Sequence, residues 1–309
     1  MIDRLIDKIE CLSAPIVVGL DPTLEMIPER IKQVSREKHC GALKAVSAAL
    51  FEFNREIIDA VCDLVPAVKL QIAMYERFGI DGLRSYIDTA LYARNKNLVV
   101  IGDIKRGDIS STAEAYAVHI GGVEIGGEKL FPWPEDAVTL NPYLGGDSVK
   151  PFLDACTAQE RGIFLLVKTS NPGSGDLQDL PLQAGQKVYE HVAMLVSEWG
   201  KTLVGSRGYS RVGAVVGATF PEQGRKLRSR MPHTFFLVPG YGAQGGSGAG
   251  LRGFFDHNGI GCIINSSRGI IAAWKKEKHF GENNVGDAAR EAVIAMIDDL
   301  KESKAAAAP

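Results

Sequence analysis

The chain has 309 residues, with 35 Lys and Arg against 37 Asp and Glu, a net charge of -2 at pH 7 and 45% hydrophobic residues. This composition is that of a globular protein, and the charge balance argues against a nucleic-acid binder or a polybasic membrane binder, which need a basic excess. No apolar run approaches the roughly 18 residues of a membrane helix, and acidic residues interrupt the first eight positions, where a signal peptide would be apolar. The five cysteines form no CxxC pair, so we expect neither a disulfide framework nor a zinc site. Free cysteines suit a reducing compartment, so we expect a cytoplasmic location.

Eight short apolar runs rich in Val and Ile alternate with longer segments along the chain. Unbroken runs of this kind are typical of strands buried on both faces, as in a parallel sheet. The predicted strands are 16–20, 67–70, 98–101, 137–140, 163–167, 212–216, 235–238 and 262–264. Apolar residues three or four apart predict amphipathic helices over 43–63 and 286–301.

Eight strands, each followed by a helix or by a loop long enough to hold one, predict an α/β fold, a single-domain (β/α)8 TIM barrel. A doubly wound open sheet is the alternative, because periodicity alone does not close a sheet. We expect the barrel domain to span 1–302 and a flexible C-terminal tail to span 303–309. The segments 119–136 and 171–182 contain Gly and Pro and are predicted to be insertions.

The densest polar cluster follows the third predicted strand and contains Asp103, Lys105 and Asp108. Asp103 and Lys105 point to the same side of a strand, and two charges at the end of an apolar strand favour the open mouth of a barrel. Neighbouring carboxylates favour the charged form of a lysine, so Lys105 is a candidate proton donor, or a cation that faces a developing anion. The alternative is a helix start, with Asp108 as its cap and Lys105 as a solvated charge.

Two further charges belong to the first two strands. Asp21 follows the first strand, where barrels place substrate ligands, although a turn-forming Asp-Pro pair is the commoner explanation. Lys69 stands inside an apolar strand, and a lysine is rarely buried without a partner. Lys69 therefore either lies at an edge or pairs with a carboxylate such as Asp103.

Glycine and arginine mark the last two strand ends. The segment 239–250 is rich in glycine, which frees backbone N–H groups to wrap an anion, and Arg268 follows the eighth strand. TIM barrels commonly bind phosphate between these two loops; for the glycines alone, a mobile surface loop is the alternative. Gly240, Gly242 and Gly245 match a dinucleotide fingerprint in form, but no strong helix begins at the third glycine, which disfavours NAD. Ser170, after the fifth strand, offers a hydroxyl to a base or sugar, or else forms a turn.

Together these motifs resemble the orotidine 5′-phosphate decarboxylase family, and the segment 169–173 resembles its longer bacterial subgroup. The resemblance covers about 15 to 275 and rests on Asp103-x-Lys105-x-x-Asp108, on Gly19-Leu20-Asp21-Pro22, on the glycine-rich segment that begins at Pro239, and on Arg268. It implies a homodimer of (β/α)8 barrels that converts orotidine 5′-phosphate to UMP and CO2 in de novo pyrimidine biosynthesis. It also implies that no metal or organic cofactor takes part.

The resemblance implies a role for each residue of these motifs. Lys69, Asp103, Lys105 and Asp108 would form an array of alternating charge, in which Lys105 stabilises and protonates a carbanion at C6 of the pyrimidine. The substrate contacts would be Asp21 and Lys69 at the ribose, Ser170 at the pyrimidine, and Gln244 and Arg268 at the phosphate, with Pro239 and Gly245 in the same loop. Asp108, Ile109 and Thr112 would reach into the active site of the partner subunit, so each site would be shared.

Two other functions stay open. A sister family of metal-dependent sugar-phosphate decarboxylases and aldolases shares the Asp-x-Lys-x-x-Asp motif, but it carries a Glu metal ligand after the second strand, where Lys69 stands here. A non-catalytic nucleotide-binding regulator would leave the charged array without a purpose. The sequence therefore predicts a metal-free carboxy-lyase with a small-molecule substrate and with neither nucleic acid nor membrane as a partner.

Overall fold

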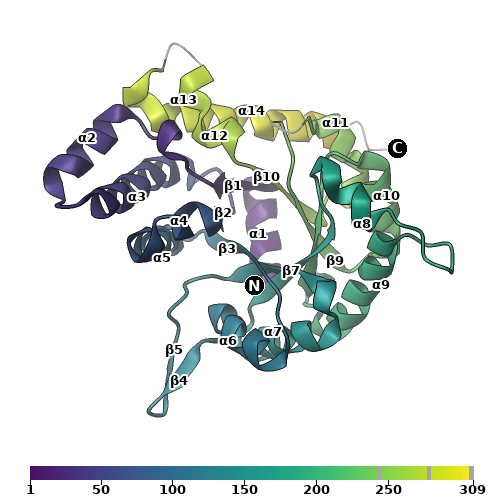
Figure 1. Cartoon of the computed structure of the whole chain (residues 1–309). Helices are drawn as coiled ribbons and strands as arrows, with labels where there is room; N and C mark the ends of the chain where they lie inside the picture. The colour runs from purple at the N-terminus through teal and green to yellow at the C-terminus, as the bar shows by residue number, and fades with distance from the viewer. Residues whose placement is uncertain (243–244, 277–279, 306–309) are drawn as a thin grey trace.

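Eight parallel strands close into a barrel in the computed structural model, which describes residues 1–242, 245–276 and 280–305 (Figure 1). The barrel strands are β1 (Ile16–Leu20), β2 (Ala67–Gln71), β3 (Val99–Arg106), β6 (Ala137–Leu140), β7 (Gly162–Lys168), β8 (Ser210–Val216), β9 (Thr234–Val238) and β10 (Cys262–Ser266). Each strand pairs with the next along the chain, and β10 pairs back onto β1 through Ile264 and Ile16. All eight predicted strands are confirmed, and the closed ring rules out the open sheet.

The outer layer consists of helices that follow the strands. The longer ones are α2 (Glu29–Lys38), α3 (Ala42–Val61), α5 (Gly79–Asn95), α6 (Ser110–Gly121), α7 (Gly146–Gln159), α9 (Val188–Gly200), α10 (Pro221–Arg230) and α14 (Val285–Ala305). The short helices and 3-10 turns are α4 (Ala73–Glu76), α8 (Gly175–Gln178), α11 (Gly248–Leu251), α12 (Arg268–Ile271), α13 (Ala273–Lys276), η1 (Leu24–Met26), η2 (Pro142–Leu144), η3 (Pro172–Ser174), η4 (Lys201–Leu203), η5 (Arg252–Phe254) and η6 (Glu282–Asn284). Among the described residues, no helix is long and apolar enough to span a membrane.

Both predicted amphipathic helices are confirmed as α3 and α14. In α3 the residues spaced three or four apart, such as Leu50, Phe53 and Ile57, are buried, whereas Leu43 at the start of the predicted stripe is exposed. The α14 helix continues to Ala305, three residues past the predicted end of the barrel domain at 302. Residues 306–309 of the predicted tail lie outside the described residues.

The helix α1 (Ile2–Leu12) packs against one end of the barrel. Its Ile2, Leu5, Ile6 and Ile9 join the side chains that fill the barrel interior, among them Phe164. The Met1 ammonium bonds the Glu160 carbonyl just before β7, so α1 lies at the amino ends of the strands. This leaves the opposite end, at the carboxyl ends of the strands, for the polar residues.

The two predicted insertions take different forms. The segment 119–136 begins with the last turn of α6 and continues as a hairpin of β4 (Val123–Ile125) and β5 (Glu128–Leu130). This hairpin projects from the body of the barrel (Figure 1). The segment 171–182 contains η3 and α8. It lies at the carboxyl ends of the strands, where it lines the cavity described next.

Candidate active site

A cavity of about 820 Å³ opens at the carboxyl ends of the barrel strands. The predicted site residues that line it are Asp21, Lys69, Asp103, Lys105, Ser170, Pro239 and Arg268. They come from the ends of β1, β2, β3, β7, β9 and β10 or from the residues that follow. Closure of the barrel thus brings together residues up to 247 positions apart, Asp21 and Arg268 being the extremes.

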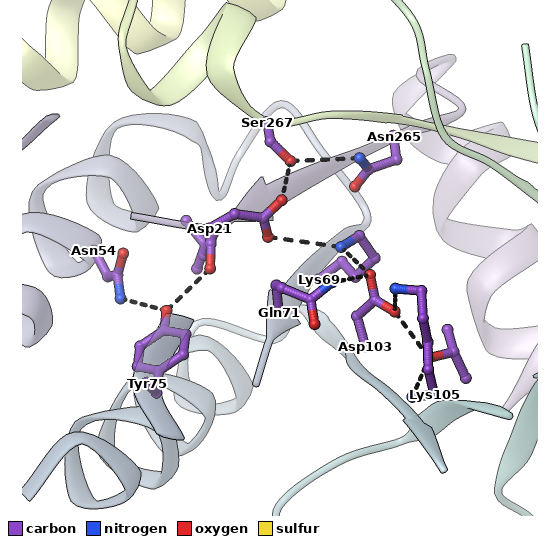
Figure 2. A network of polar contacts seen from close by, with 11 residues as sticks. Asp21, Asn54, Lys69, Gln71, Tyr75, Asp103, Lys105, Asn265 and Ser267 are labelled. Atoms are coloured by element: carbon purple, nitrogen blue, oxygen red, sulfur yellow. Dashed lines mark hydrogen bonds and ion pairs between the residues drawn. The ribbon is translucent and has the colours of Figure 1, made fainter. Parts of the chain in front are cut away.

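Asp103 is the centre of the polar network on the cavity wall (Figure 2). Its Oδ2 accepts hydrogen bonds from Lys69 Nζ at 2.7 Å and Gln71 Nε2 at 3.1 Å. Its Oδ1 accepts from Lys105 Nζ at 2.5 Å and Thr139 Oγ1 at 2.9 Å. Four donors from three strands therefore fix the carboxylate in one orientation.

Burial and charge set the ionisation of this pair. Lys69 is 3% exposed and Asp103 is 6% exposed. Burial alone would raise the pKa of Asp103, but the ammonium groups of Lys69 and Lys105 outweigh it and lower that pKa well below its usual range. Burial likewise opposes the charge on Lys69, but the carboxylates of Asp103 and Asp21 raise the pKa of Lys69 above its usual value. The predicted pairing of Lys69 with Asp103 is confirmed, and the edge position is excluded.

Lys105 carries the most accessible charge among Lys69, Asp103 and Lys105. Counting side-chain atoms alone, Lys105 is 44% exposed and Asp103 is 9% exposed. Its backbone has φ of 45°, a left-handed conformation that costs a non-glycine residue about 1 kcal/mol. The register between β3 and β6 shifts at this point, between Gly102 and Arg106, and the Lys105 N–H donates to Thr139 Oγ1 at 3.0 Å. The strained backbone directs the ammonium back over Asp103 and into the cavity.

The ends of β1 and β10 supply a second group of polar atoms beside Lys69. Ser267 Oγ donates to Asp21 Oδ2 at 2.6 Å, and Asp21 Oδ1 lies 3.6 Å from Lys69 Nζ. A Cβ at Gly19 would fall 1.8 Å from Ser267 Oγ, so this approach requires glycine. Within the described residues, Asp21 Oδ1 and Asn265 Oδ1 are buried and accept no hydrogen bond. Both oxygens belong to cavity-lining residues and are suited to hydroxyl donors of a ligand.

Tyr75 holds the strand that leads into Asp21. Its hydroxyl donates to the Leu20 carbonyl at 3.0 Å and accepts from Asn54 Nδ2 at 2.9 Å (Figure 2). Tyr75 and Asn54 are fully buried. The end of β1 is thereby anchored from behind, one residue before the carboxylate.

Ser170 lies on the side of the cavity formed by the end of β7 and the insertion 171–182. Gln178 of the insertion accepts from the Thr169 N–H at 3.0 Å and donates to Thr169 Oγ1 at 2.8 Å. Ser170 itself lines the cavity, and its carbonyl accepts from Thr219 Oγ1 at 3.1 Å. The insertion is therefore part of the cavity wall.

The glycine-rich loop and Arg268 face the cavity from β9 and β10. Pro239, Gly240 and Arg268 line it, and the Arg268 side chain is exposed. Gly240 and Gly245 have φ of 102° and 94°, which only glycine adopts without strain. Gly245 does not line the cavity, and Gln244 lies outside the described residues.

Asp108, Ile109 and Thr112 do not line the cavity of their own chain. The Asp108 carboxylate accepts from the Ile109 N–H at 2.8 Å, while α6 begins at Ser110 with no side-chain cap. The alternative in which Asp108 caps this helix is therefore wrong, because its carboxylate bonds the residue before the helix. Ile109 is 61% exposed, Thr112 is exposed and Asp108 is partly exposed.

Sequence reasoning assigned no role to Gln71, Thr139, Asn265 and Ser267, which complete the network. Gln71 lies two residues after Lys69, and Ser267 two residues after Asn265, so strand alternation places each pair on one side. That parity was a usable signal for Gln71. Thr139 carries no such signal, because an isolated threonine is common in a strand.

Metal-ligand geometry is absent from the described part of the chain. No group of three or more His, Cys, Asp or Glu side chains there could hold a metal ion. The two cavity carboxylates, Asp21 and Asp103, both lie beside the Lys69 ammonium.

Known proteins resemble this chain over most of its length. The model of the orotidine 5′-phosphate decarboxylase / HUMPS family matches residues 14–280. The orotidine 5′-phosphate decarboxylase of Rhodopirellula baltica is 48% identical over 288 residues, covering 92% of this chain and 93% of that protein. The protein of the same name from Caldicellulosiruptor bescii is 44% identical over 90% of this chain and 91% of its own length.

Solved structures agree with this assignment. The putative orotidine 5′-phosphate decarboxylase of Streptomyces avermitilis has 28% identity and a TM-score of 0.77, with 98% of this chain and 95% of that chain covered. The OMP decarboxylase of Leishmania donovani has 28% identity and a TM-score of 0.73, with 98% of each chain covered. The chain belongs to the orotidine 5′-phosphate decarboxylase / HUMPS family.

Proposed function

We propose that this chain is an orotidine 5′-phosphate decarboxylase, a carboxy-lyase that forms UMP and CO2 in de novo pyrimidine biosynthesis. The observation that carries the proposal is the Lys69–Asp103–Lys105 array on the wall of the cavity, in which a buried Lys69–Asp103 pair holds the more exposed Lys105 ammonium. It occurs in a chain that is 40–48% identical, over most of its length, to curated proteins of that name.

The array matches the electrostatic demand of the reaction. When the bond from C6 to the carboxylate breaks, CO2 departs and the electron pair stays on C6, with no adjacent group to delocalise it. Stabilisation must then come from charges fixed in advance, and the Lys105 ammonium is the accessible cation of the group. Lys105 then transfers a proton from Nζ to C6, which gives UMP and a neutral amine that water reprotonates.

Asp103 and Lys69 support that step without changing protonation state. Asp103 remains ionised because its pKa is lowered, and it holds the Lys105 ammonium at 2.5 Å. Lys69, buried and paired, balances the charge of Asp103 from the other side. The array needs little reorganisation when charge appears at C6, which is the condition for strong electrostatic catalysis.

The remaining cavity residues bind the rest of the nucleotide. Asp21, with its unbonded Oδ1, and Lys69 contact the ribose hydroxyls, and Ser170 contacts the pyrimidine. Arg268 binds the phosphate together with Gln244 and the loop that contains Pro239 and Gly245. Phosphate binding closes the loop, and this remote binding energy is used in the transition state.

A second subunit completes each site in this proposal. Asp108, Ile109 and Thr112 extend into the partner's cavity, where Asp108 lies near the departing carboxylate. Large exposed apolar side chains support such a contact: Ile109 at 61%, Tyr143 at 75% and Leu144 at 46%. Ile109 follows β3, and Tyr143 and Leu144 follow β6. A hydrogen bond from the Asn141 N–H to the Arg106 carbonyl, at 2.8 Å, links the ends of these two strands. We propose a homodimer in the cytoplasm, a compartment that suits its five free cysteines.

The sister class of metal-dependent sugar-phosphate enzymes finds no support in this cavity. The position of its metal-ligating Glu is occupied by Lys69, whose pKa is raised, so the side chain keeps its charge. A buried ammonium beside Asp21 and Asp103 repels a divalent cation from both carboxylates.

An assay of the purified chain with orotidine 5′-phosphate and EDTA separates these functions. UMP formation at the same rate with and without the chelator is the expected result. Activity that is lost in EDTA and restored by Mg²⁺ would identify the metal-dependent class. Nucleotide binding without turnover would identify a regulator.

A further inference from the structure

The C-terminal helix contacts the glycine-rich loop through one carboxylate. Asp299 lies in α14, and its Oδ2 accepts a hydrogen bond from the Tyr241 hydroxyl at 2.6 Å. The same oxygen accepts a second one from the Gly248 N–H at 3.0 Å. Asp299 does not line the cavity, so it acts on the loop from behind.

These two contacts fall on opposite sides of the loop. Tyr241 lines the cavity next to Pro239 and Gly240, whereas Gly248 begins α11, which lies alongside α14 in Figure 1. The two sides also bond one another, since the Gly242 N–H donates to the Gly246 carbonyl at 2.8 Å and the Gly246 N–H to the Gly240 carbonyl at 3.1 Å. Asp299 therefore attaches both sides of the loop base to the C-terminal helix.

Tyr241 connects this attachment to the cavity. Its side chain lines the cavity and is partly buried. Burial and the neighbouring Asp299 carboxylate both raise the pKa of Tyr241, so the phenol stays protonated and can donate to Asp299. A hydrogen bond between a phenol and a carboxylate is charge-assisted and strong.

We propose that Asp299 is a positioning residue for phosphate recognition, which fixes the base of the glycine-rich loop through Tyr241 and Gly248. A loop of this composition has many backbone conformations when it is free, and ordering it on binding would reduce affinity. The attachment to α14 removes part of that cost before the phosphate arrives. This inference rests on the proposed function, in which the loop and Arg268 bind the phosphate of the substrate.

The test compares ligands that differ only in the phosphate. Asp299→Ala should lower kcat/KM for orotidine 5′-phosphate about 10- to 100-fold, the range expected for lost hydrogen bonds to a charged group. Its kcat/KM for orotidine, which lacks the phosphate, should change less than about 2-fold. Asp299→Asn keeps an acceptor oxygen and should recover part of the loss. Asp298→Ala, on the neighbouring exposed residue of α14, is the matched control and should match the wild type.

A double-mutant cycle tests the connection through Tyr241. Tyr241→Phe removes the hydrogen bond from the phenol to Asp299 but keeps the ring and the Gly248 contact, so it should lose less than Asp299→Ala. The Asp299→Ala/Tyr241→Phe double variant should lose no more than Asp299→Ala alone, because the phenol acts through the carboxylate. Additive losses would contradict this connection.

Calorimetry with UMP and uridine gives a readout that does not depend on turnover. Asp299→Ala should weaken UMP binding by the same 10- to 100-fold and leave uridine binding unchanged. Equal losses on both ligands, or unchanged UMP binding, would overturn the positioning role. A wild type that binds UMP but forms none from orotidine 5′-phosphate would refute the proposed function, while the UMP comparison would still decide the role of Asp299.

Discussion

One carboxylate, that of Asp103, links the two lysines of the cavity. It is 6% exposed and accepts four hydrogen bonds, two of them from ammonium groups. Removing one partner from a buried ion pair leaves an uncompensated charge, which costs far more than losing a pair at the surface. Lys69 is therefore expected to stabilise the fold at this wall of the cavity, in addition to its proposed role in catalysis.

Lys69→Met should lower the free energy of unfolding by about 3–5 kcal/mol, because it strands Asp103 in a buried environment. Lys96→Met is the control, since Lys96 pairs with Asp59 at the surface, where both side chains are more than one-third exposed. That variant should lose far less stability, because solvent screens an exposed ion pair. Urea unfolding of both variants measures the difference, and equal losses would mean that the buried pair adds nothing beyond a surface pair.

Arg268→Ala should impair phosphate recognition and leave the charged array intact. An arginine contact with phosphate is charge-assisted and often bidentate, so we expect kcat/KM for orotidine 5′-phosphate to fall by about 100-fold or more. The loss with orotidine should be much smaller. Arg252→Ala, on an exposed arginine that does not line the cavity, is the control. Equal losses on both substrates would show that Arg268 has a structural role.

At the scale of elements, the strands were predictable and the position of the first helix was not. The eight barrel strands are apolar on both faces because the interior and the outer helices bury them, and that pattern is visible in the sequence. The apolar residues of α1 have helical spacing, but its packing against the barrel interior depends on contacts with residues more than 150 positions away. The same limit applies to the insertion 171–182, whose role as cavity wall follows only from the closed barrel.

Ile6→Ala should destabilise the barrel by about 2–4 kcal/mol, because Ile6 is 1% exposed and its loss leaves a cavity beneath the interior side chains. Cys11→Ala, on an exposed residue of the same helix, should change the free energy of unfolding by less than about 0.5 kcal/mol. Chemical denaturation of the two variants measures the contrast. A loss for Ile6→Ala no larger than for Cys11→Ala would mean that α1 does not contribute to the core.

At the scale of the whole molecule, the cavity of one chain is lined by only part of the predicted site residues. Lys69, Asp103 and Lys105 line one cavity, whereas Asp108, three positions after Lys105, does not line it, and neither do Ile109 and Thr112. The motif could be recognised from its spacing in sequence. In the proposed homodimer, the arrangement of the two subunits decides which cavity each member serves, and a single chain carries no direct signal of that arrangement.

The most direct test of the proposed array is to mix two inactive variants. Lys105→Ala and Asp108→Ala should each be nearly inactive, because each homodimer then lacks one essential group in both sites. In a mixed dimer, one site carries both substitutions and the other carries neither, since a two-fold dimer exchanges equivalent contacts. With random pairing half of the dimers are mixed and each has one intact site, so activity should rise to about a quarter of the wild-type value. A mixture that stays as inactive as its parents, after subunit exchange has been demonstrated, would contradict a site shared between two chains.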